Sequence, residues 1–154
     1  MHLIPDLKEF IELLNSENVR YLVIGGWAFN RYAEPRFTGD LDFFVAVDSE
    51  NQGRIRKALV RFGFASVLPP EAAPLFEKKI LMLGRPPNRI DLLREISGVE
   101  FEQAWKDRQG GSLDGLPVNF ISCAHLIQNK RAAAREKDLA DVKILERLEK
   151  IPSR

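Results

Sequence analysis

The sequence is poor in the residues that build thiol- or imidazole-based sites. It contains one cysteine, Cys123, and two histidines, His2 and His125. A single cysteine excludes an internal disulfide framework and a cysteine-rich zinc site, which favours a reducing compartment such as the cytoplasm. His2 stands at the start of the chain, and His125 follows Ser122, a good helix N-cap, so we assign neither histidine a catalytic role.

Long apolar runs and excess charge of one sign are also missing. No uninterrupted apolar run approaches the ~18 residues of a membrane span, and the first residues lack a basic region followed by an apolar stretch. We therefore expect no export signal and no contact with a membrane. The formal net charge is only +1, so a nucleic-acid partner would need a local basic patch.

What is present is typical of a folded α+β (α/β) protein. Apolar residues make up 45% of the 154 residues and charged residues 29%, and this length suits a single domain. We expect its sheet within about residues 1–121 and C-terminal helices over about residues 122–150.

Apolar spacing indicates where the helices and strands lie. The pattern predicts a mixed, mostly antiparallel sheet flanked by helices, with the helices packed on one side. Expected helices cover residues 7–16, 27–32, 49–62 and 123–148, the last broken near Glu136, and one more lies between residues 93 and 113. Expected strands cover residues 21–24, 41–47, 79–83 and 89–93, followed by a hairpin that ends near residue 121.

Two aspartates lie two residues apart where the second strand is expected. Side chains at this spacing in a strand share a face, which places Asp40 and Asp42 together, ~7 Å apart along the chain. Aspartate is depleted in strands and like charges repel, so the pair weakens the fold unless a cation lies between them. Carboxylate oxygens favour Mg²⁺ or Mn²⁺. A solvated strand edge with alternating acids is the competing interpretation.

Two further features could belong to the same site. Gly25 and Gly26 close the first strand in a tight turn and open a helix, so their backbone N–H groups could approach phosphate oxygens. A plain turn explains them equally well. Asp91 is an acid in an otherwise apolar strand, so it needs an ion pair, a metal or a raised pKa. Arg89 and Arg94 are its candidate partners.

Together these residues resemble the nucleotidyltransferase superfamily, which has the DNA polymerase beta-like fold. Its motif is a Gly-Gly or Gly-Ser turn after a strand, Asp-x-Asp on the next strand and a third carboxylate further on. The resemblance is strongest to small bacterial proteins of the abortive-infection toxin-like type, which carry Gly-Gly and then Pro-x-Arg-x-Thr-x-Asp-x-Asp. That series is here Gly25, Gly26, Pro35, Arg36, Thr38, Asp40 and Asp42. Tyr32 and Ala33 replace the His-Gly pair that members often carry before the proline.

The resemblance extends into the C-terminal helices. The family pattern Leu-Ile-x-x-Lys, then Arg-x-x-Asp-Leu-x-Asp-Val, is similar to the stretch from Leu126 to Val142. It implies that Lys130 reaches into the cleft and neutralises triphosphate oxygens. Asp138 and Asp141 are expected to pair with nearby lysines or arginines.

The resemblance implies a metal-dependent enzyme that moves a nucleoside monophosphate from a nucleoside triphosphate such as ATP to a hydroxyl group, releasing pyrophosphate. Mg²⁺ or Mn²⁺ would be the cofactor. The metal ligands and catalytic residues would be Asp40, Asp42 and Asp91, with Asp91 as the general base or as the residue that positions it. The nucleotide-binding set would be Gly25, Gly26, Arg36, Thr38 and Lys130, in which Arg36 and Thr38 mainly order the Asp-bearing strand.

The motif does not encode the acceptor. RNA or a protein is our expectation, because a chain this short leaves little sequence to enclose a drug-sized ligand and residues 130–137 are basic. A small-molecule drug as acceptor, and a homodimer that closes the cleft, are alternatives. So is a non-catalytic nucleotide- or partner-binding module, such as one component of a toxin–antitoxin pair.

Overall fold

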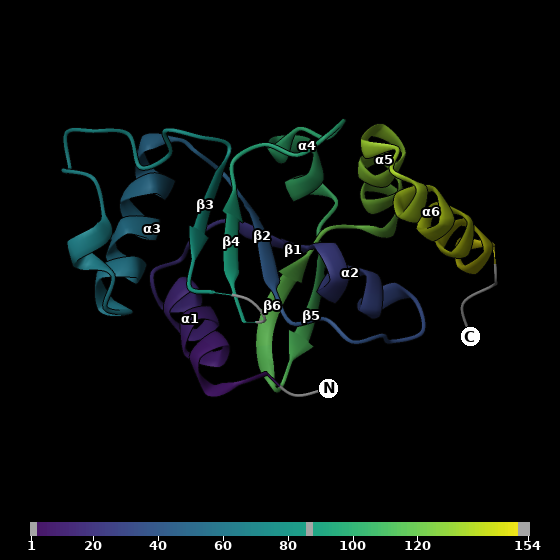
Figure 1. Ribbon diagram of the computed structural model, residues 1–154, viewed down its shortest axis with the longest axis horizontal. Helices are drawn as coiled ribbons and strands as arrows, with labels where there is room; N and C mark the ends of the chain where they lie inside the picture. The colour runs from purple at the N-terminus through teal and green to yellow at the C-terminus, as the bar shows by residue number, and fades with distance from the viewer. Residues whose placement is uncertain (1–2, 86–87, 151–154) are drawn as a thin grey trace.

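The computed structural model describes residues 3–85 and 88–150. Helices and strands alternate from α1 to α3, and paired strands and two C-terminal helices follow (Figure 1). The helices are α1 (Pro5–Ser16), α2 (Gly25–Tyr32), α3 (Ser49–Arg61), α4 (Phe101–Lys106), α5 (Cys123–Ala133) and α6 (Glu136–Glu149), with a 3-10 turn η1 at Ala65–Val67. The strands are β1 (Tyr21–Ile24), β2 (Leu41–Val45), β3 (Ile80–Leu83), β4 (Ile90–Leu93), β5 (Gln109–Leu113) and β6 (Leu116–Phe120).

The six strands form one sheet in the order β3-β4-β2-β1-β6-β5. The pairs β1–β2, β3–β4 and β5–β6 are antiparallel, and the pairs β1–β6 and β2–β4 are parallel. The predicted mixed, mostly antiparallel sheet is therefore confirmed. Its centre is made by β4, β2 and β1, the strands that carry or adjoin the acids and glycines of the sequence motif.

Helices cover both faces of this sheet. Phe43 of β2 packs against Phe10 of α1, with ring centroids 5.7 Å apart. The next residue, Phe44, points to the opposite face and contacts Phe101 of α4 at 5.2 Å. The expectation that the helices gather on one side is therefore wrong for α4. In Figure 1, α3 lies on the side of β3, and α5 and α6 lie together at the other end of the molecule.

Strand β2 ends at Val45, two residues earlier than predicted. Side chains from the first turn of α3 donate hydrogen bonds to the backbone carbonyls of the next two residues. The amide of Asn51 donates to the carbonyl of Ala46 at 2.7 Å, and that of Gln52 donates to the carbonyl of Val47 at 2.6 Å. These bonds replace the ladder that a longer strand would need.

The C-terminal helices begin and end as the sequence indicates. The side chain of Ser122 accepts a hydrogen bond from the backbone N–H of His125 and so caps α5. Ala134 adopts a left-handed φ of 58°, which ends α5 and allows α6 to start in a new direction. Among the described residues, none of the helices has the length and apolar character needed to cross a membrane.

Candidate functional site

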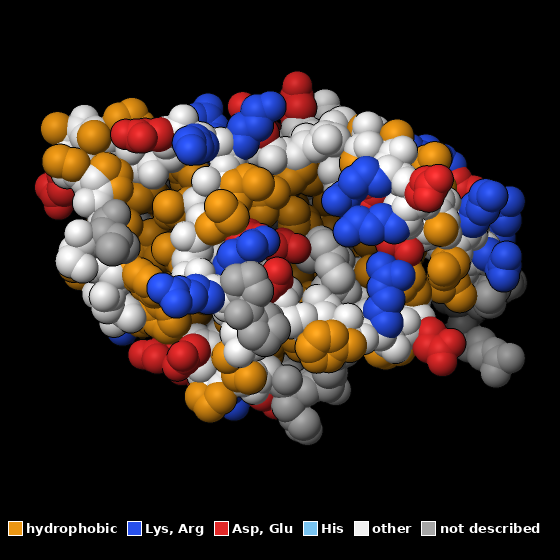
Figure 2. All heavy atoms as spheres, in the orientation of Figure 1, with side chains coloured by type: hydrophobic (Ala, Val, Ile, Leu, Met, Phe, Trp, Pro, Cys, Tyr) orange, Lys and Arg blue, Asp and Glu red, His pale blue; other side chains and the backbone are white. Residues whose placement is uncertain are grey.

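Carboxylates from two neighbouring strands meet on one face of the sheet. Asp42 of β2 and Asp91 of β4 are register partners in a parallel pair, so their side chains lie next to each other. Asp40 lies one residue before β2, which begins at Leu41 as predicted. Figure 2 shows acidic side chains near the centre of this face, with hydrophobic side chains above them and Lys and Arg side chains to their right.

Gly25 and Gly26 lie directly against the residues that carry the acids. Gly25 has a φ of +66°, and a Cβ atom there would lie 2.4 Å from Oδ2 of Asp42. A Cβ atom on Gly26 would lie 2.6 Å from Oγ1 of Thr38. Both glycines are the first residues of α2, so the strand enters the helix without the separate turn that we predicted. Glycine therefore lets the N-terminus of α2, with its partial positive charge, reach the carboxylate of Asp42.

A single arginine holds the other two acids. The guanidinium of Arg89 donates to both carboxylate oxygens of Asp91, at 2.7 Å and 3.0 Å. Its Nη2 also lies 3.7 Å from Oδ2 of Asp40, while the backbone N–H of Arg89 donates to Oδ1 of Asp40 at 3.1 Å. Of the two partners proposed for Asp91, Arg89 is the correct one.

The surroundings of Asp42 oppose its ionisation. The pKa of Asp42 is raised to about 7, chiefly by burial, and the hydrogen bond to Asp91 and the charges of Asp91 and Asp40 contribute in the same direction. The charge of Arg89 acts the opposite way. Additional positive charge at this point would therefore favour the carboxylate form of Asp42.

The chemistry of this donor set fits a hard divalent cation. Asp42 and Asp91 supply adjacent oxygen donors, and crowding of their charges makes a cation favourable. Over residues 3–85 and 88–150, no three Asp, Glu, His or Cys side chains are grouped to hold a metal ion in this arrangement. Arg89 instead provides the positive charge at Asp91 and Asp40. A metal ion would compete with Arg89 for the oxygens of Asp91.

Two of the acids, Asp42 and Asp91, form the floor of a cleft of about 570 Å³. One wall comes from α5 and the start of α6, where Lys130, Arg135 and Asp138 lie. The opposite wall comes from β3 and β4 and the chain that follows, where Ile80 and Leu93 lie. A larger cavity of about 920 Å³ lies between α3 and residues 71–74, but the three acids do not line it. The smaller cleft is thus the candidate site.

Lys130 lies in the wall of the cleft, where its charge is already shared. Its Nζ is 2.8 Å from Oδ2 of Asp141 and 3.8 Å from Oδ1 of Asp138. Arg36 binds the same Asp141 through both carboxylate oxygens, at 2.9 Å and 2.8 Å, and stacks 3.8 Å from the ring centroid of Phe29. Burial would raise the pKa of Asp141, but the hydrogen bonds from Arg36 and Lys130 outweigh it and lower that pKa.

The predicted residues therefore divide into three groups. Gly25, Asp42, Asp91 and Lys130 line the cleft. Asp40, Gly26 and Thr38 lie just behind it: Oγ1 of Thr38 donates to the carbonyl of Asp40 at 3.5 Å. Arg36 faces α6 instead. Asp138 and Asp141 form the expected ion pairs, but Arg36 lies 105 positions from Asp141, so no local spacing could have identified it.

Sequence reasoning missed the wall formed by β3 and β4. Ile80 and Leu93 line the cleft, with Lys79 and Glu95 beside them in an ion pair at 3.5 Å. Alternation along the strand could have placed Leu93 on the face of Asp91. It could not have shown that this face is left open.

No family model matches the sequence, and no curated protein matches it either. Its fold is similar to that of solved structures, among them the following two. The crystal structure of the lincosamide antibiotic adenylyltransferase LnuA, lincomycin-bound, aligns with a TM-score of 0.58 at 13% identity, over 96% of this chain and 98% of that chain. An antigenic nucleotidyltransferase-like protein from Paracoccidioides brasiliensis aligns with a TM-score of 0.50 at 15% identity, over 93% and 74% of the two chains.

The chain accordingly has a nucleotidyltransferase-like fold, as its motif residues predicted. At these levels of identity, the likeness shows the arrangement of helices and strands. The chemistry of the site has to be argued from this chain's own residues.

Proposed function

We propose that this protein is a metal-dependent nucleotidyltransferase, which moves a nucleoside monophosphate from a nucleoside triphosphate to an acceptor hydroxyl. The observation that carries the proposal is the pairing of Asp42 with Asp91 on the floor of a cleft, directly beside Gly25 at the N-terminus of α2. The nucleotidyltransferase-like fold supports it.

The triphosphate would lie between α2 and the wall made by α5 and α6. The N-terminus of α2 offers free backbone N–H groups and partial positive charge to phosphate oxygens. Lys130 and Arg135 line the same part of the cleft. Both side chains already form ion pairs with acids of the chain. Their positive charge would therefore be shared between those acids and the phosphates.

The reaction would use the acids in two ways. Asp42 and Asp91, with Asp40, would hold Mg²⁺ or Mn²⁺, which when bound neutralises the triphosphate and the charge that develops during transfer. Asp91 would accept the proton of the acceptor hydroxyl as general base. The acceptor oxygen then bonds to the α-phosphorus, and the bond from that phosphorus to the bridging oxygen breaks, so pyrophosphate leaves with the electron pair.

A small-molecule acceptor fits this site better than RNA or protein. LnuA, whose chain aligns over 98% of its length, was crystallised with lincomycin, so a short chain of this fold can bind a drug-sized ligand. The basic segment that favoured RNA is also largely neutralised by the chain's own acids. Arg131 pairs with Glu146, and Arg135 pairs with Asp138. We therefore propose a small hydroxylated molecule as the acceptor, with a macromolecule as the alternative.

Metal-dependent triphosphate binding tests the proposal before the acceptor is known. Isothermal titration with ATP, GTP, CTP and UTP is run in Mg²⁺ or Mn²⁺ and again in EDTA, on the wild type and on Asp42→Asn. We expect heat of binding for at least one triphosphate only with metal, and its loss in Asp42→Asn. Binding that is indifferent to EDTA, or unchanged in the variant, would remove the acids from the site.

A further inference from the structure

The edge strand β3 presents an apolar surface beside the acids. Met82 is the register partner of Asp91, and Ile80 is the register partner of Leu93. Cross-strand partners share a face, and so do residues two apart in one strand. Met82, Ile80 and Leu93 therefore lie on the same face as Asp42 and Asp91. We call these three residues the acceptor shelf.

Two of the three residues of the acceptor shelf are exposed, in contrast to their neighbours. Ile80 is 42% exposed and Met82 is 59% exposed, while Leu83, on the other face of β3, is 5% exposed. On the same face, Phe44 is covered by Phe101 of α4 and is 1% exposed. The solvated face of an antiparallel strand ordinarily carries polar residues, so exposed Ile and Met next to buried acids point to a ligand surface.

We propose that the acceptor shelf binds the apolar body of a small hydroxylated acceptor and so determines acceptor specificity; this inference rests on the nucleotidyltransferase function proposed above. An acceptor hydroxyl has to approach Asp91, and the acceptor shelf is the surface that adjoins Asp91 on the side away from α5 and α6. Ile80 and Leu93 line the cleft itself, whose volume of about 570 Å³ suits a drug-sized molecule.

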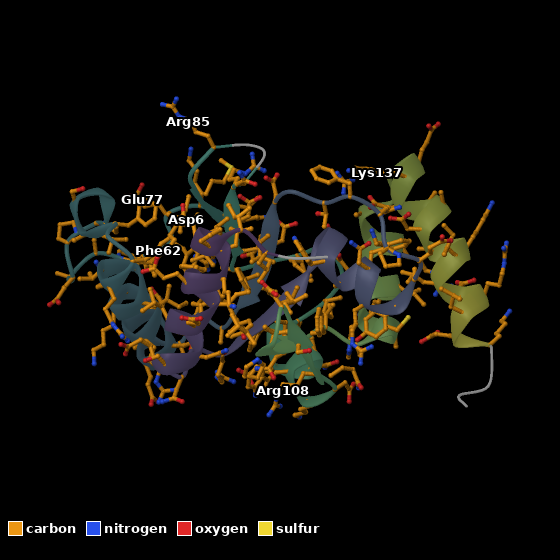
Figure 3. The ribbon with its side chains drawn as sticks, turned by 90° about the horizontal axis from the view of Figure 1, so that it is seen from below. Asp6, Phe62, Glu77, Arg85, Arg108 and Lys137 are labelled. Carbon is orange, nitrogen blue, oxygen red and sulfur yellow. The ribbon has the colours of Figure 1, made fainter. Side chains whose placement is uncertain are left out.

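The charges around the acceptor shelf favour a neutral or weakly charged occupant over a nucleic acid. Nζ of Lys79 lies 3.5 Å from a carboxylate oxygen of Glu95, and the guanidinium of Arg89 is bound by Asp91. Arg85 follows β3, but its side chain points away from the body of the molecule in Figure 3. A phosphate backbone needs free basic groups along its path. An aliphatic or ring-shaped body needs only the exposed apolar side chains that are present.

The composition of the chain offers a direct probe of this surface. Met82 is one of only two methionines, so protein labelled with ¹³C-methyl methionine gives a signal for Met82 that a Met82→Leu variant assigns. The labelled protein is titrated with lincomycin, with octyl glucoside below its micelle concentration, with an aminoglycoside and with single-stranded RNA. Each titration is run with and without Mg²⁺ and a non-hydrolysable ATP analogue.

We expect the Met82 methyl signal to shift with lincomycin or octyl glucoside, which carry aliphatic groups, and not with the aminoglycoside or RNA. Ile80→Ser should weaken that binding roughly tenfold, because it removes a buried aliphatic contact. Ile144→Ser is the matched control. Ile144 lies on α6, and its exposed fraction of 41% is similar to the 42% of Ile80. Its replacement should leave the affinity within about twofold.

Three results would overturn the proposal. The first is a Met82 signal that neither lincomycin nor octyl glucoside shifts, and the second is a Met82 signal that only RNA shifts. The third is a Met82 signal that changes with protein concentration alone, which would indicate that a second copy of the chain covers β3. These results are separate from failure of the proposed function. If the ATP analogue does not bind, the nucleotidyltransferase function fails, while the titrations without it still report on the surface.

Discussion

Arg89 and Asp91 form a two-bond ion pair at the floor of the cleft, with Nε of Arg89 2.7 Å from Oδ1 of Asp91. The same arginine contacts Asp40 through its backbone and its guanidinium, so one residue of the chain neutralises two of the three acids. The acids can therefore crowd together in the metal-free protein. The arrangement also sets Arg89 in competition with any metal ion for the oxygens of Asp91.

Replacing Arg89 should shift the balance between folding and metal binding. In Arg89→Ala, the acids lose their internal cation, so the melting temperature in EDTA should fall. The competitor for Asp91 is also removed, so Mn²⁺ should bind several-fold more tightly and restore more stability than it does in the wild type. Thermal unfolding across a Mn²⁺ titration measures both effects on one preparation.

Arg85→Ala is the control for this prediction. It removes the same charge from the same connection between β3 and β4, at a side chain that points away from the body of the molecule in Figure 3. Its melting temperature and Mn²⁺ affinity should match the wild type. If Arg89→Ala weakens Mn²⁺ binding instead, Arg89 supports the metal site rather than competing with it.

The raised pKa of Asp42 predicts a pH dependence of stability without metal. The pKa of Asp42 is raised from 3.8 to about 7, so between these values the folded protein holds a proton that the unfolded chain has released. The resulting stability is complete below the lower value and is lost as the pH rises through about 7.

Asp42→Asn should abolish this slope, and at pH 8 in EDTA its free energy of unfolding should exceed that of the wild type by up to a few kcal/mol. Urea unfolding of both proteins from pH 4 to 8 tests this. Parallel curves for the two proteins would mean that Asp42 titrates normally. Saturating Mg²⁺ should flatten the wild-type curve, because the cation favours the carboxylate.

Much of the fold could be predicted because local patterns determine it. Ser122 and Asp48 cap helices through side-chain bonds to residues three positions on, which is a signal within the sequence itself. Asp114 and Gly115, which both have positive φ, mark the hairpin between β5 and β6. These interactions span a few residues, so the order and type of the elements could be inferred.

Single residues of the site could be predicted from their chemical type or from the motif, as Asp42, Asp91, Gly25 and Lys130 were. Asp42 and Asp91 lie in apolar strands, and their chemical type marks them. Which strands are neighbours depends on the whole sheet, so their pairing could not be derived from spacing. The same limit hid the bond between Arg36 and Asp141 and the exposure of Ile80. The covering of the second face by α4 likewise depends on the contact between Phe44 and Phe101.

Asp141 should be important for stability although it does not line the cleft. It accepts hydrogen bonds from Arg36 and from the buried Lys130, and so joins the loop before β2 to the C-terminal helices. Asp141→Ala would leave the ammonium of Lys130 buried without this partner. Loss of one member of a buried ion pair typically costs about 3–5 kcal/mol, so the denaturation midpoint should fall markedly.

Glu50→Ala provides the comparison for Asp141→Ala. Glu50 pairs with Arg54 on the surface of α3, and its side chain is 72% exposed. A surface pair of this kind contributes about 0–1 kcal/mol, so the free energy of unfolding should change little. Equal losses in the two variants would mean that the pairing of Asp141 with Lys130 and Arg36 adds nothing beyond a surface contact.

Gly25→Ala should damage the site directly. The new Cβ atom would lie 2.4 Å from Oδ2 of Asp42, and φ at this position is +66°, which alanine tolerates poorly. Strain of this kind costs about 1–3 kcal/mol. Relief of the clash has to move Asp42, and a shift near 1 Å in a reacting group can lower the rate of transfer on the order of hundredfold.

Gly53→Ala is the control that separates the clash with Asp42 from the general effect of replacing a glycine with alanine. Gly53 lies within α3, and a Cβ atom added there meets nothing within 4 Å. Because alanine favours the helix, this variant should gain about 0.5–1 kcal/mol and keep full metal-dependent triphosphate binding. Gly25→Ala should lose that binding even where both proteins are folded, as circular dichroism would show. Retention of triphosphate binding in folded Gly25→Ala would mean that the contact between Gly25 and Asp42 does not position the acid.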